Sequence, residues 1–178
     1  MPGYAPTIGE IMDKNIETCS FTGHRNIKND HIKKLPDLLL RAIRYAYEKG
    51  CRTFLAGGAV GFDTEAARAV ISFRLSHPEV RLKLILPCVD QAERWSEHQR
   101  SVYEYTLSEA DEVVYISDSY YDGCLKERNR ALAEQCDILI AYVGRYNSGA
   151  AQTARMATSL GKQVYNLYPT LDGRTGKD

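Results

Sequence analysis

The feature that most constrains this chain is a regular alternation between short apolar runs and longer segments of helical periodicity. The apolar runs, rich in β-branched and aromatic residues, cover residues 18–22, 52–56, 82–86, 112–117, 137–143 and 163–167. Between them, apolar side chains recur every three or four residues, which is the period of an amphipathic helix. The alternation predicts parallel βαβ units joined by right-handed crossovers.

The composition of the runs indicates how the sheet is covered. Residues 82–86 and 138–141 are almost continuously apolar, as expected of strands with helices packed on both faces. We therefore predict an α/β fold, a Rossmann-like doubly wound and mainly parallel sheet in three layers. The first helical stripe runs from Ile32 to Ala46. Pro36 fits it only if the helix begins near Lys33, which leaves the ring in the opening turn.

Length and charge set further bounds. The 178 residues favour one domain, which we place at residues 16–169, with loose segments at 1–15 and 170–178. The 23 Lys and Arg residues balance the 23 Asp and Glu residues, so no global field draws the chain to nucleic acid or to an anionic membrane. A nucleic-acid partner is therefore unexpected.

The cysteines and the apolar runs indicate the compartment. The five cysteines lie far apart and form no Cys-x-x-Cys pair, which favours reduced thiols over disulfides or zinc. The first fifteen residues do not read as a signal peptide, and no run approaches the roughly 18 apolar residues that span a bilayer. We expect a cytoplasmic protein with no membrane partner, assembled as a homo-oligomer.

Three glycine-bearing loops follow predicted strands, at residues 22–25, 57–64 and 144–149. Because ligands of an open parallel sheet bind beyond the carboxyl ends of its strands, these loops are expected to share one edge and form one site. The 57–64 loop has neither the G-x-G-x-x-G spacing nor the ending of a Walker A loop, which argues against nicotinamide cofactors and ATP hydrolysis. Its free amides could hold a phosphate, or the loop could be a tight turn without a ligand.

Charged side chains near these loops extend the candidate site. His24 could bond a ligand hydroxyl or move a proton, and Arg25 suits a phosphate; an exposed loop pair is the alternative. Arg128 lies on the apolar stripe of a predicted helix, where a buried guanidinium needs a partner. It could pair with Asp63 or Asp137, or reach the ligand crevice, which the neighbouring Asn129 favours.

Other polar and aromatic residues carry weaker signals. Gly149 opens an alanine-rich helix whose amino end could hold a second anion. Trp95, the only tryptophan, is favoured as a core anchor over a base-stacking platform, and Tyr120 could edge a pocket or lie on the surface. The scattered His31, His77 and His98 are expected to be solvated, and no metal-ligand cluster stands out.

Several motifs together resemble the YpsA-like branch of the SLOG superfamily. They are Cys19-Ser20-Phe21-Thr22-Gly23-His24-Arg25, Gly57-Gly58-Ala59-Val60-Gly61-Phe62-Asp63, Glu127-Arg128-Asn129-Arg130 and Cys136-Asp137-Ile138-Leu139-Ile140-Ala141. The resemblance spans about residues 17–168. It implies a Rossmann-like nucleotide-binding fold, related to the Lonely Guy phosphoribohydrolases and to DNA-processing protein A.

The Lonely Guy enzymes carry an arginine in a Met-His-Glu-Arg-Lys segment and a glutamate in Pro-Gly-Gly-x-Gly-Thr-x-x-Glu. Arg128 matches that arginine, whereas the glutamate position falls on Gln152 or Thr153. An oxocarbenium-like transition state needs a carboxylate nearby, which neither residue supplies. The resemblance therefore implies binding without implying hydrolysis.

From these observations we predict a sensor-type protein that binds a nucleotide, a nucleotide derivative or another phosphorylated small molecule. One alternative is a nucleoside monophosphate phosphoribohydrolase in which Asp63 or Glu127 replaces the glutamate; another is a protein-interaction module with a vestigial pocket. No cofactor, metal ligand or catalytic residue is assigned. The candidate ligand-binding residues are Gly23, His24, Arg25, Gly57, Gly58, Gly61, Asp63, Thr64, Arg128, Asn129, Gly144, Ser148, Gly149, Gln152 and Thr153.

Overall fold

The computed structural model describes residues 15–174, which form a six-stranded sheet of order β4-β3-β2-β1-β5-β6. Every paired neighbour runs parallel. The strands are β1 (Thr18–Gly23), β2 (Thr53–Ala56), β3 (Arg81–Cys88), β4 (Glu112–Ser117), β5 (Ile138–Tyr142) and β6 (Gln163–Asn166). The expected parallel sheet is confirmed, and the strands lie within one or two residues of the apolar runs.

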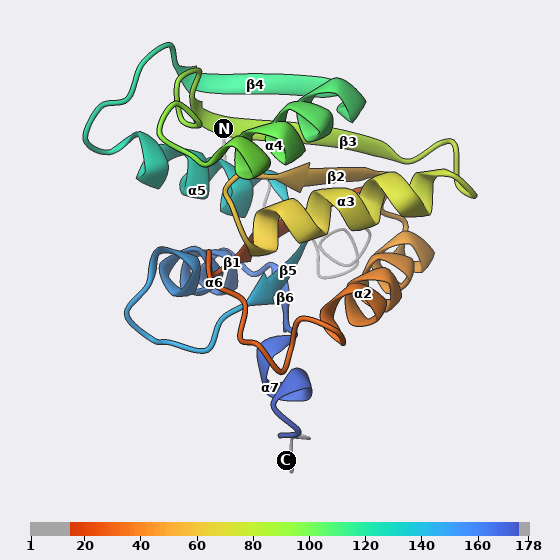
Figure 1. Ribbon diagram of the computed structural model, residues 1–178. Coiled ribbons are helices and arrows are strands. Elements are labelled where there is room, and N and C mark those ends of the chain that lie inside the picture. The colour runs from red at the N-terminus through yellow and green to blue at the C-terminus, as the bar shows by residue number, and fades with distance from the viewer. Residues whose placement is uncertain (1–14, 175–178) are drawn as a thin grey trace, which may run out of the picture.

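Helices cover both faces of the sheet (Figure 1). Three of them, α2 (Leu35–Lys49), α3 (Phe62–Arg74) and α4 (Glu97–Glu109), pack together on one face, and α5 (Cys124–Gln135) packs beside α6 (Gly149–Ser159) on the other. A short helix, α7 (Tyr168–Leu171), follows β6. The Rossmann-like, doubly wound, three-layer α/β fold is therefore confirmed.

The main core lies between the sheet and the helices α2 and α3. Phe21 on β1 stacks on Phe54 at a centroid distance of 6.2 Å, and Phe62 stacks on Tyr142 at 5.6 Å. A side chain at Gly23 would collide with the Phe62 ring. The close approach of α3 to the end of β1 therefore needs glycine at this position, which fixes the first turn of α3 above the sheet edge.

The first helix begins later than the apolar stripe indicates. It starts at Leu35 with Pro36 in its opening turn, so Ile32 lies before the helix and is 52% exposed. Proline lacks the amide that a helix interior needs. The proline ring therefore determines where the helix starts, and Ile32 fits the apolar period of the helix without belonging to it.

The strand order creates a crevice at one edge of the sheet. β1 pairs with β2 on one side and with β5 on the other. The chain adds β2, β3 and β4 on one side of β1 and then returns to add β5 and β6 on its other side. At such a switch point the loops after the two strands part, and an open α/β sheet binds its ligands there.

The segment after β6 packs against the domain through a buried histidine. His31 is completely buried, so the expectation that it is solvated is wrong. Its Nε2 atom lies 2.9 Å from Asp172 Oδ1, and its Nδ1 atom lies 2.8 Å from the Tyr142 hydroxyl. The tail expected to be loose from residue 170 therefore contacts the domain at Leu171, which is buried, and at Asp172. Residues 1–14 and 175–178 of the two expected loose segments lie outside the described part.

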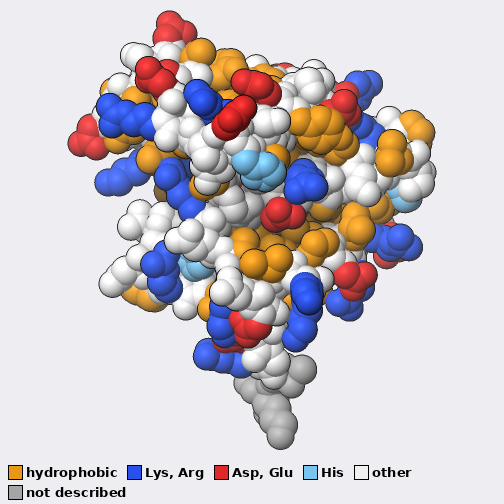
Figure 2. Space-filling view, viewed as in Figure 1, with side chains coloured by type: hydrophobic (Ala, Val, Ile, Leu, Met, Phe, Trp, Pro, Cys, Tyr) orange, Lys and Arg blue, Asp and Glu red, His pale blue; other side chains and the backbone are white. Residues whose placement is uncertain are grey.

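The surface carries charges of both signs. On the face drawn in Figure 2, Lys and Arg side chains alternate with Asp and Glu side chains, and no field of a single sign covers it. Across residues 15–174, no helix is both long enough and apolar enough to cross a membrane.

The Tyr142 hydroxyl gives a test of this packing. It accepts the Lys28 amide at 3.1 Å and pairs with His31. Tyr142→Phe removes this partner from the Lys28 amide and from the His31 Nδ1 atom. We therefore expect the free energy of unfolding, measured in urea, to fall by about 1–3 kcal/mol. Tyr45→Phe is the control, because its hydroxyl pairs with Tyr165 on the surface and its loss should stay within about 0.5 kcal/mol. Equal losses in both variants would show that the His31 contacts do not stabilise the fold.

Candidate functional site

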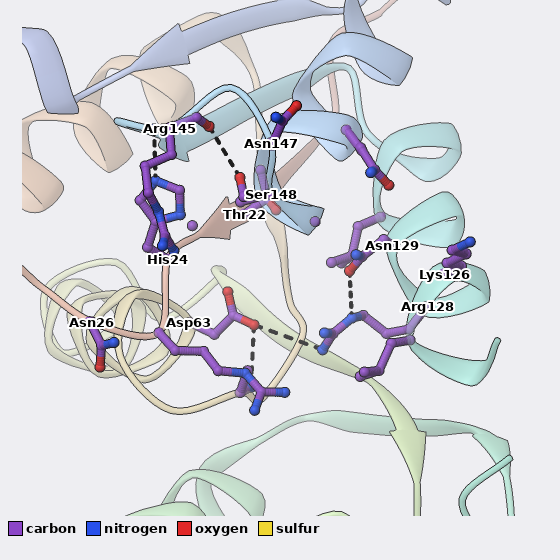
Figure 3. A pocket seen from close by; sticks show the side chains of 18 of the residues that line it. Thr22, His24, Asn26, Asp63, Lys126, Arg128, Asn129, Arg145, Asn147 and Ser148 are labelled. Carbon is purple, nitrogen blue, oxygen red and sulfur yellow. Dashed lines mark hydrogen bonds and ion pairs between the residues drawn. The ribbon is translucent and has the colours of Figure 1, made fainter. Parts of the chain in front are cut away.

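A cavity of about 740 Å³ lies at the switch point between β1 and β5 (Figure 3). Its walls come from the loops after β1, β2, β4 and β5 and from residues of α3, α5 and α6. The candidate residues that line it are Gly23, His24, Arg25, Asp63, Arg128, Asn129, Ser148, Gly149 and Gln152. All three glycine-bearing loops therefore lie at the same edge of the sheet.

Arg128 forms the floor of the cavity. Its side chain is 7% exposed and lies 3.8 Å from Asp63, measured from Nη1 to Oδ2. Nη1 also donates to the Gly57 carbonyl, and Nε donates to Asn129 Oδ1 at 2.8 Å. Arg128 thus pairs with Asp63 and lines the cavity at once, which unites two of the interpretations of this residue (Figure 3).

The pairing with Asp137 does not occur. Asp137 Oδ2 accepts the amides of Glu17 and Thr18, at 2.9 and 3.1 Å. It therefore stabilises the start of β1, at the end of the sheet opposite the cavity.

Two glycines let the β2–α3 loop approach these charges. A side chain at Gly57 would collide with the Arg128 guanidinium and crowd the Asp63 carboxylate. Gly61 has a φ of 82° and precedes α3, and a side chain there would meet the Arg25 backbone. These glycines make room for Arg128, Asp63 and the Arg25 backbone, and they do not line the cavity themselves.

Burial opposes charge on both members of the Arg128–Asp63 pair. It raises the pKa of the Asp63 carboxyl, while Arg128, the Ala59 amide and Arg25 pull that pKa down. It also lowers the pKa of Arg128, which Asp63 opposes. Removing one member of such a pair strands a buried charge, so the pair is a structural unit as well as a wall of the cavity.

His24 holds the β5–α6 loop through an unprotonated ring nitrogen. Its Nε2 atom accepts the Gly144 amide at 2.8 Å and the Arg145 amide at 3.3 Å. An acceptor nitrogen carries no proton, so the neutral imidazole fits this position. Burial lowers the His24 pKa, and the nearby Arg145 lowers it further. His24 thus positions Arg145 at the cavity wall.

The start of α6 forms the opposite wall. Ser148 caps the helix, because its hydroxyl accepts the Ala151 amide at 3.0 Å. Of the two positions that could match the glutamate of the hydrolases, Gln152 lines the cavity. Thr153 is buried and donates to the Gly149 carbonyl at 2.8 Å, so it faces away from the cavity.

Cations outnumber acids around the cavity. Arg25, Lys126, Arg128 and Arg145 line it together with the carboxylates of Asp63 and Asp122. The amino ends of α3, α5 and α6 also border it, through Asp63, Gly123 and Gly149. Helix amino ends and arginines both favour negative charge, so the cavity is suited to an anion.

Several predicted residues lie outside this cavity, and others were missed. Gly57, Gly58, Gly61, Thr64, Gly144 and Thr153 do not line it and instead support the loops. The lining also includes Thr22, Asn26, Ala59, Tyr120, Asp122, Gly123, Leu125, Lys126, Leu132, Arg145, Asn147 and Ala150. Arg145 could have been found from the sequence, because it lies in the 144–149 loop, and Lys126 directly precedes the motif that begins at Glu127. Tyr120 is one of the candidate pocket-edge residues of the sequence.

One group among residues 15–174 has the spacing of a metal site. The ligand atoms of Asp30, His31 and Asp172 lie within 4.8 Å of one another. The Lys28 ammonium lies 2.7 Å from Asp172 and 3.5 Å from Asp30. The two carboxylates that a metal would need are thus already paired with the Lys28 ammonium.

The parallel sheet, its switch point and the cavity beyond it define a Rossmann-like α/β protein. The family model of YpsA, described as the YspA SLOG family, matches residues 16–169. The chain therefore belongs to the YpsA-like branch of the SLOG superfamily, as its motifs indicate. A UPF0398 protein of Bacillus thuringiensis is 29% identical to it over 145 residues, which covers 79% of either chain.

Two solved structures share the fold. DNA processing protein A from Helicobacter pylori, described for its single-stranded DNA binding mode, superposes with a TM-score of 0.60 at 17% identity. DNA processing protein A from Streptococcus pneumoniae gives 0.62 at the same identity. The alignments cover 84% and 85% of this chain but only 64% and 50% of those two proteins.

The His24 contacts predict an acid-sensitive stability. Unfolded histidine protonates near pH 6.5, and the lowered pKa in the folded state means that the unfolded chain binds more protons just below that pH. Stability should therefore fall as the pH drops below about 6.5. His24→Gln keeps an acceptor for the Gly144 amide without a titrating group, so its profile of urea unfolding against pH should be flatter. If stability depends on pH in the same way in the two proteins, His24 does not act as an uncharged hydrogen-bond acceptor in the folded state.

Proposed function

We propose that the domain at residues 16–169 binds a nucleotide or a nucleotide derivative in the switch-point cavity and acts as a sensor. The observation that carries the proposal is the meeting of four cationic side chains and three helix amino ends in one cavity. The volume of about 740 Å³ falls within the range of small-molecule sites, about 300–1,000 Å³. It leaves room for a sugar beside a phosphate.

The phosphate position follows from the charges. Arg145 and the first residues of α6, Gly149 and Ala150, line one side of the cavity, and Arg25 and Lys126 line it elsewhere. Arg128 is already paired with Asp63, so it contributes less free charge than its neighbours. The phosphate would therefore lie at the α6 end, with Gln152 close enough to hold a ribose hydroxyl.

Hydrolysis of an N-glycosidic bond is the enzymatic alternative. The position facing the cavity is Gln152, a neutral amide. Asp63, one proposed replacement, is buried against Arg128, and Glu127, the other, lies in a neighbouring hollow beside α6. Binding without turnover is favoured, because a solvated carboxylate to stabilise an oxocarbenium ion is missing at the Gln152 position.

Nucleic acid remains among the partners to test. The zero net charge of the chain argues against it, yet DNA processing protein A of the same fold is described as binding single-stranded DNA. The comparisons therefore do not support the expectation that nucleic acid is not a partner. A module that uses the domain only for protein contacts is the third possibility, and it predicts an empty cavity.

The compartment and the assembly are proposals too. The five cysteines are all free and buried, in keeping with a reducing compartment such as the cytoplasm. Val114 and Tyr115 are exposed on the edge strand β4. Apolar side chains on an open sheet edge favour a homo-oligomer.

A thermal-shift screen against nucleotides, ribose 5-phosphate and a single-stranded oligonucleotide tests the function. A ligand at 100 times its dissociation constant should add about 2.7 kcal/mol to the free energy of unfolding. Stabilisation by small phosphorylated ligands without turnover supports the sensor. Stabilisation by the oligonucleotide alone would favour nucleic acid, and no stabilisation by any of them would favour the protein-interaction module.

Arg145→Ala tests the position of the phosphate. A charge-assisted contact contributes about 1.5–3 kcal/mol, so the affinity for a bound nucleoside monophosphate should fall about 10- to 150-fold in isothermal titration. The melting temperature should stay the same, because Arg145 is exposed. Arg68→Ala is the control, since Arg68 is an exposed residue of α3 outside the cavity. An unchanged affinity in Arg145→Ala would place the phosphate elsewhere.

Gln152→Glu tests the separation of binding from chemistry. We expect no release of free base and ribose 5-phosphate from nucleoside monophosphates by the wild type, and slow release by this variant, measured by chromatography. Thr153→Glu should instead destabilise the protein, because Thr153 is 1% exposed. Robust turnover by the wild type would show that another carboxylate, with Asp63 the first to mutate, carries out the reaction.

A further inference from the structure

A second hollow of about 380 Å³ adjoins the switch-point cavity. It lies over the loop after β3, and its apolar walls are Pro87, Trp95, Leu125 and the ring of Tyr120. Arg25, Tyr120 and Leu125 line both this hollow and the main cavity. The two spaces therefore share a wall, and one ligand could occupy both.

The charges of the hollow differ from those of the cavity. Two cations, Arg25 and Arg94, face two acids, Asp90 and Glu93. The hollow therefore lacks the excess of positive charge that an anion needs. A flat apolar group with polar edges fits it better than a second phosphate does.

Two contacts hold the aromatic walls in place. The Trp95 ring meets Tyr103 edge to face at a centroid distance of 5.2 Å. The Tyr120 amide donates to Asp90 Oδ1 at 3.1 Å, which ties the β4–α5 loop to the loop after β3. The Tyr120 side chain itself is 62% exposed and is therefore free to close over a ring.

Polar groups border the hollow without filling it. Gln91 lines the hollow and donates from Nε2 to the Gly58 carbonyl at 3.4 Å, so an amide side chain forms part of the wall. Nucleobases present an apolar face for stacking and polar edges for hydrogen bonds. The composition of the hollow matches both requirements.

We propose that this hollow is the base subsite of the ligand, with Trp95 and Tyr120 stacking on the base. The proposal rests on the proposed function, since it adds a subsite to the same site. Arg25, on the shared wall, would lie between the base and the phosphate. The ligand class is thereby narrowed to nucleotides with an intact aromatic base, in preference to sugar phosphates.

Trp95 reports on this subsite directly because it is the only tryptophan of the chain. Its fluorescence can be followed during titration with adenosine monophosphate, guanosine monophosphate and ribose 5-phosphate. We expect both nucleotides to quench Trp95 saturably, whereas ribose 5-phosphate binds more weakly and leaves the emission unchanged. N-acetyltryptophanamide, titrated in parallel, corrects for absorption by the bases.

Variants separate stacking from indirect quenching. Stacking of a base on an aromatic side chain is lost with alanine, so Trp95→Ala should bind adenosine monophosphate at least about 5-fold more weakly in isothermal titration. Trp95→Phe should retain most of the affinity. The exposed Tyr120 allows the same comparison, Tyr120→Ala against Tyr120→Phe, even if Trp95→Ala fails to fold. Affinity for ribose 5-phosphate should be the same in all folded variants.

Two results would overturn the proposal in distinguishable ways. If adenosine monophosphate and ribose 5-phosphate bind with equal affinity, and the alanine variants bind both as the wild type does, the base subsite is wrong while the proposed function stands. If the wild type binds none of the three compounds in the calorimeter, the proposed function fails and the subsite fails with it.

Discussion

The buried contact of Arg128 with Asp63 and the Gly57 carbonyl is the interaction on which the site depends. It joins α5, which lies on one face of the sheet, to the β2–α3 loop and to α3, which lies on the other. The contact crosses the edge of the sheet beyond the carboxyl end of β2, and both side chains line the cavity. A guanidinium buried to this extent needs both partners, and only glycine at position 57 lets the backbone reach it.

The same arrangement underlies the proposal that this chain binds a ligand without reacting with it. Cations and helix amino ends line the cavity and would hold the proposed phosphate, and Gln152, which also lines it, would face the ribose. Asp63 has a carboxylate, but Arg128 and the Ala59 amide already hold it. His24 is likewise engaged, because its acceptor nitrogen orders the loop that presents Arg145. The polar groups of the site thus act mainly in positioning, which suits a sensor better than a hydrolase.

The fold could be predicted from the sequence because its signals are local. Continuous apolar runs mark the buried strands, and glycines mark the turns after them. The lining of the cavity was predicted less fully, because a glycine that permits a turn and a residue that lines the cavity give the same signal in the sequence. Gly57 makes room for Arg128, which lines the cavity, whereas Gly144 lies against the Tyr168 ring and donates its amide to His24. The burial of His31 depends on Asp172, which is 141 residues away, and no local pattern reveals such a contact.

Hydrogen exchange of the wild-type protein with and without adenosine monophosphate tests the central claim most directly, because it locates a ligand without any mutation. The account predicts slower exchange in three of the segments that line the cavity, at residues 22–26, 120–129 and 145–152. It predicts no change around the separate hollow that Lys28 and Arg174 line. Protection confined to that second hollow, or exchange unaffected by saturating nucleotide, would contradict the account.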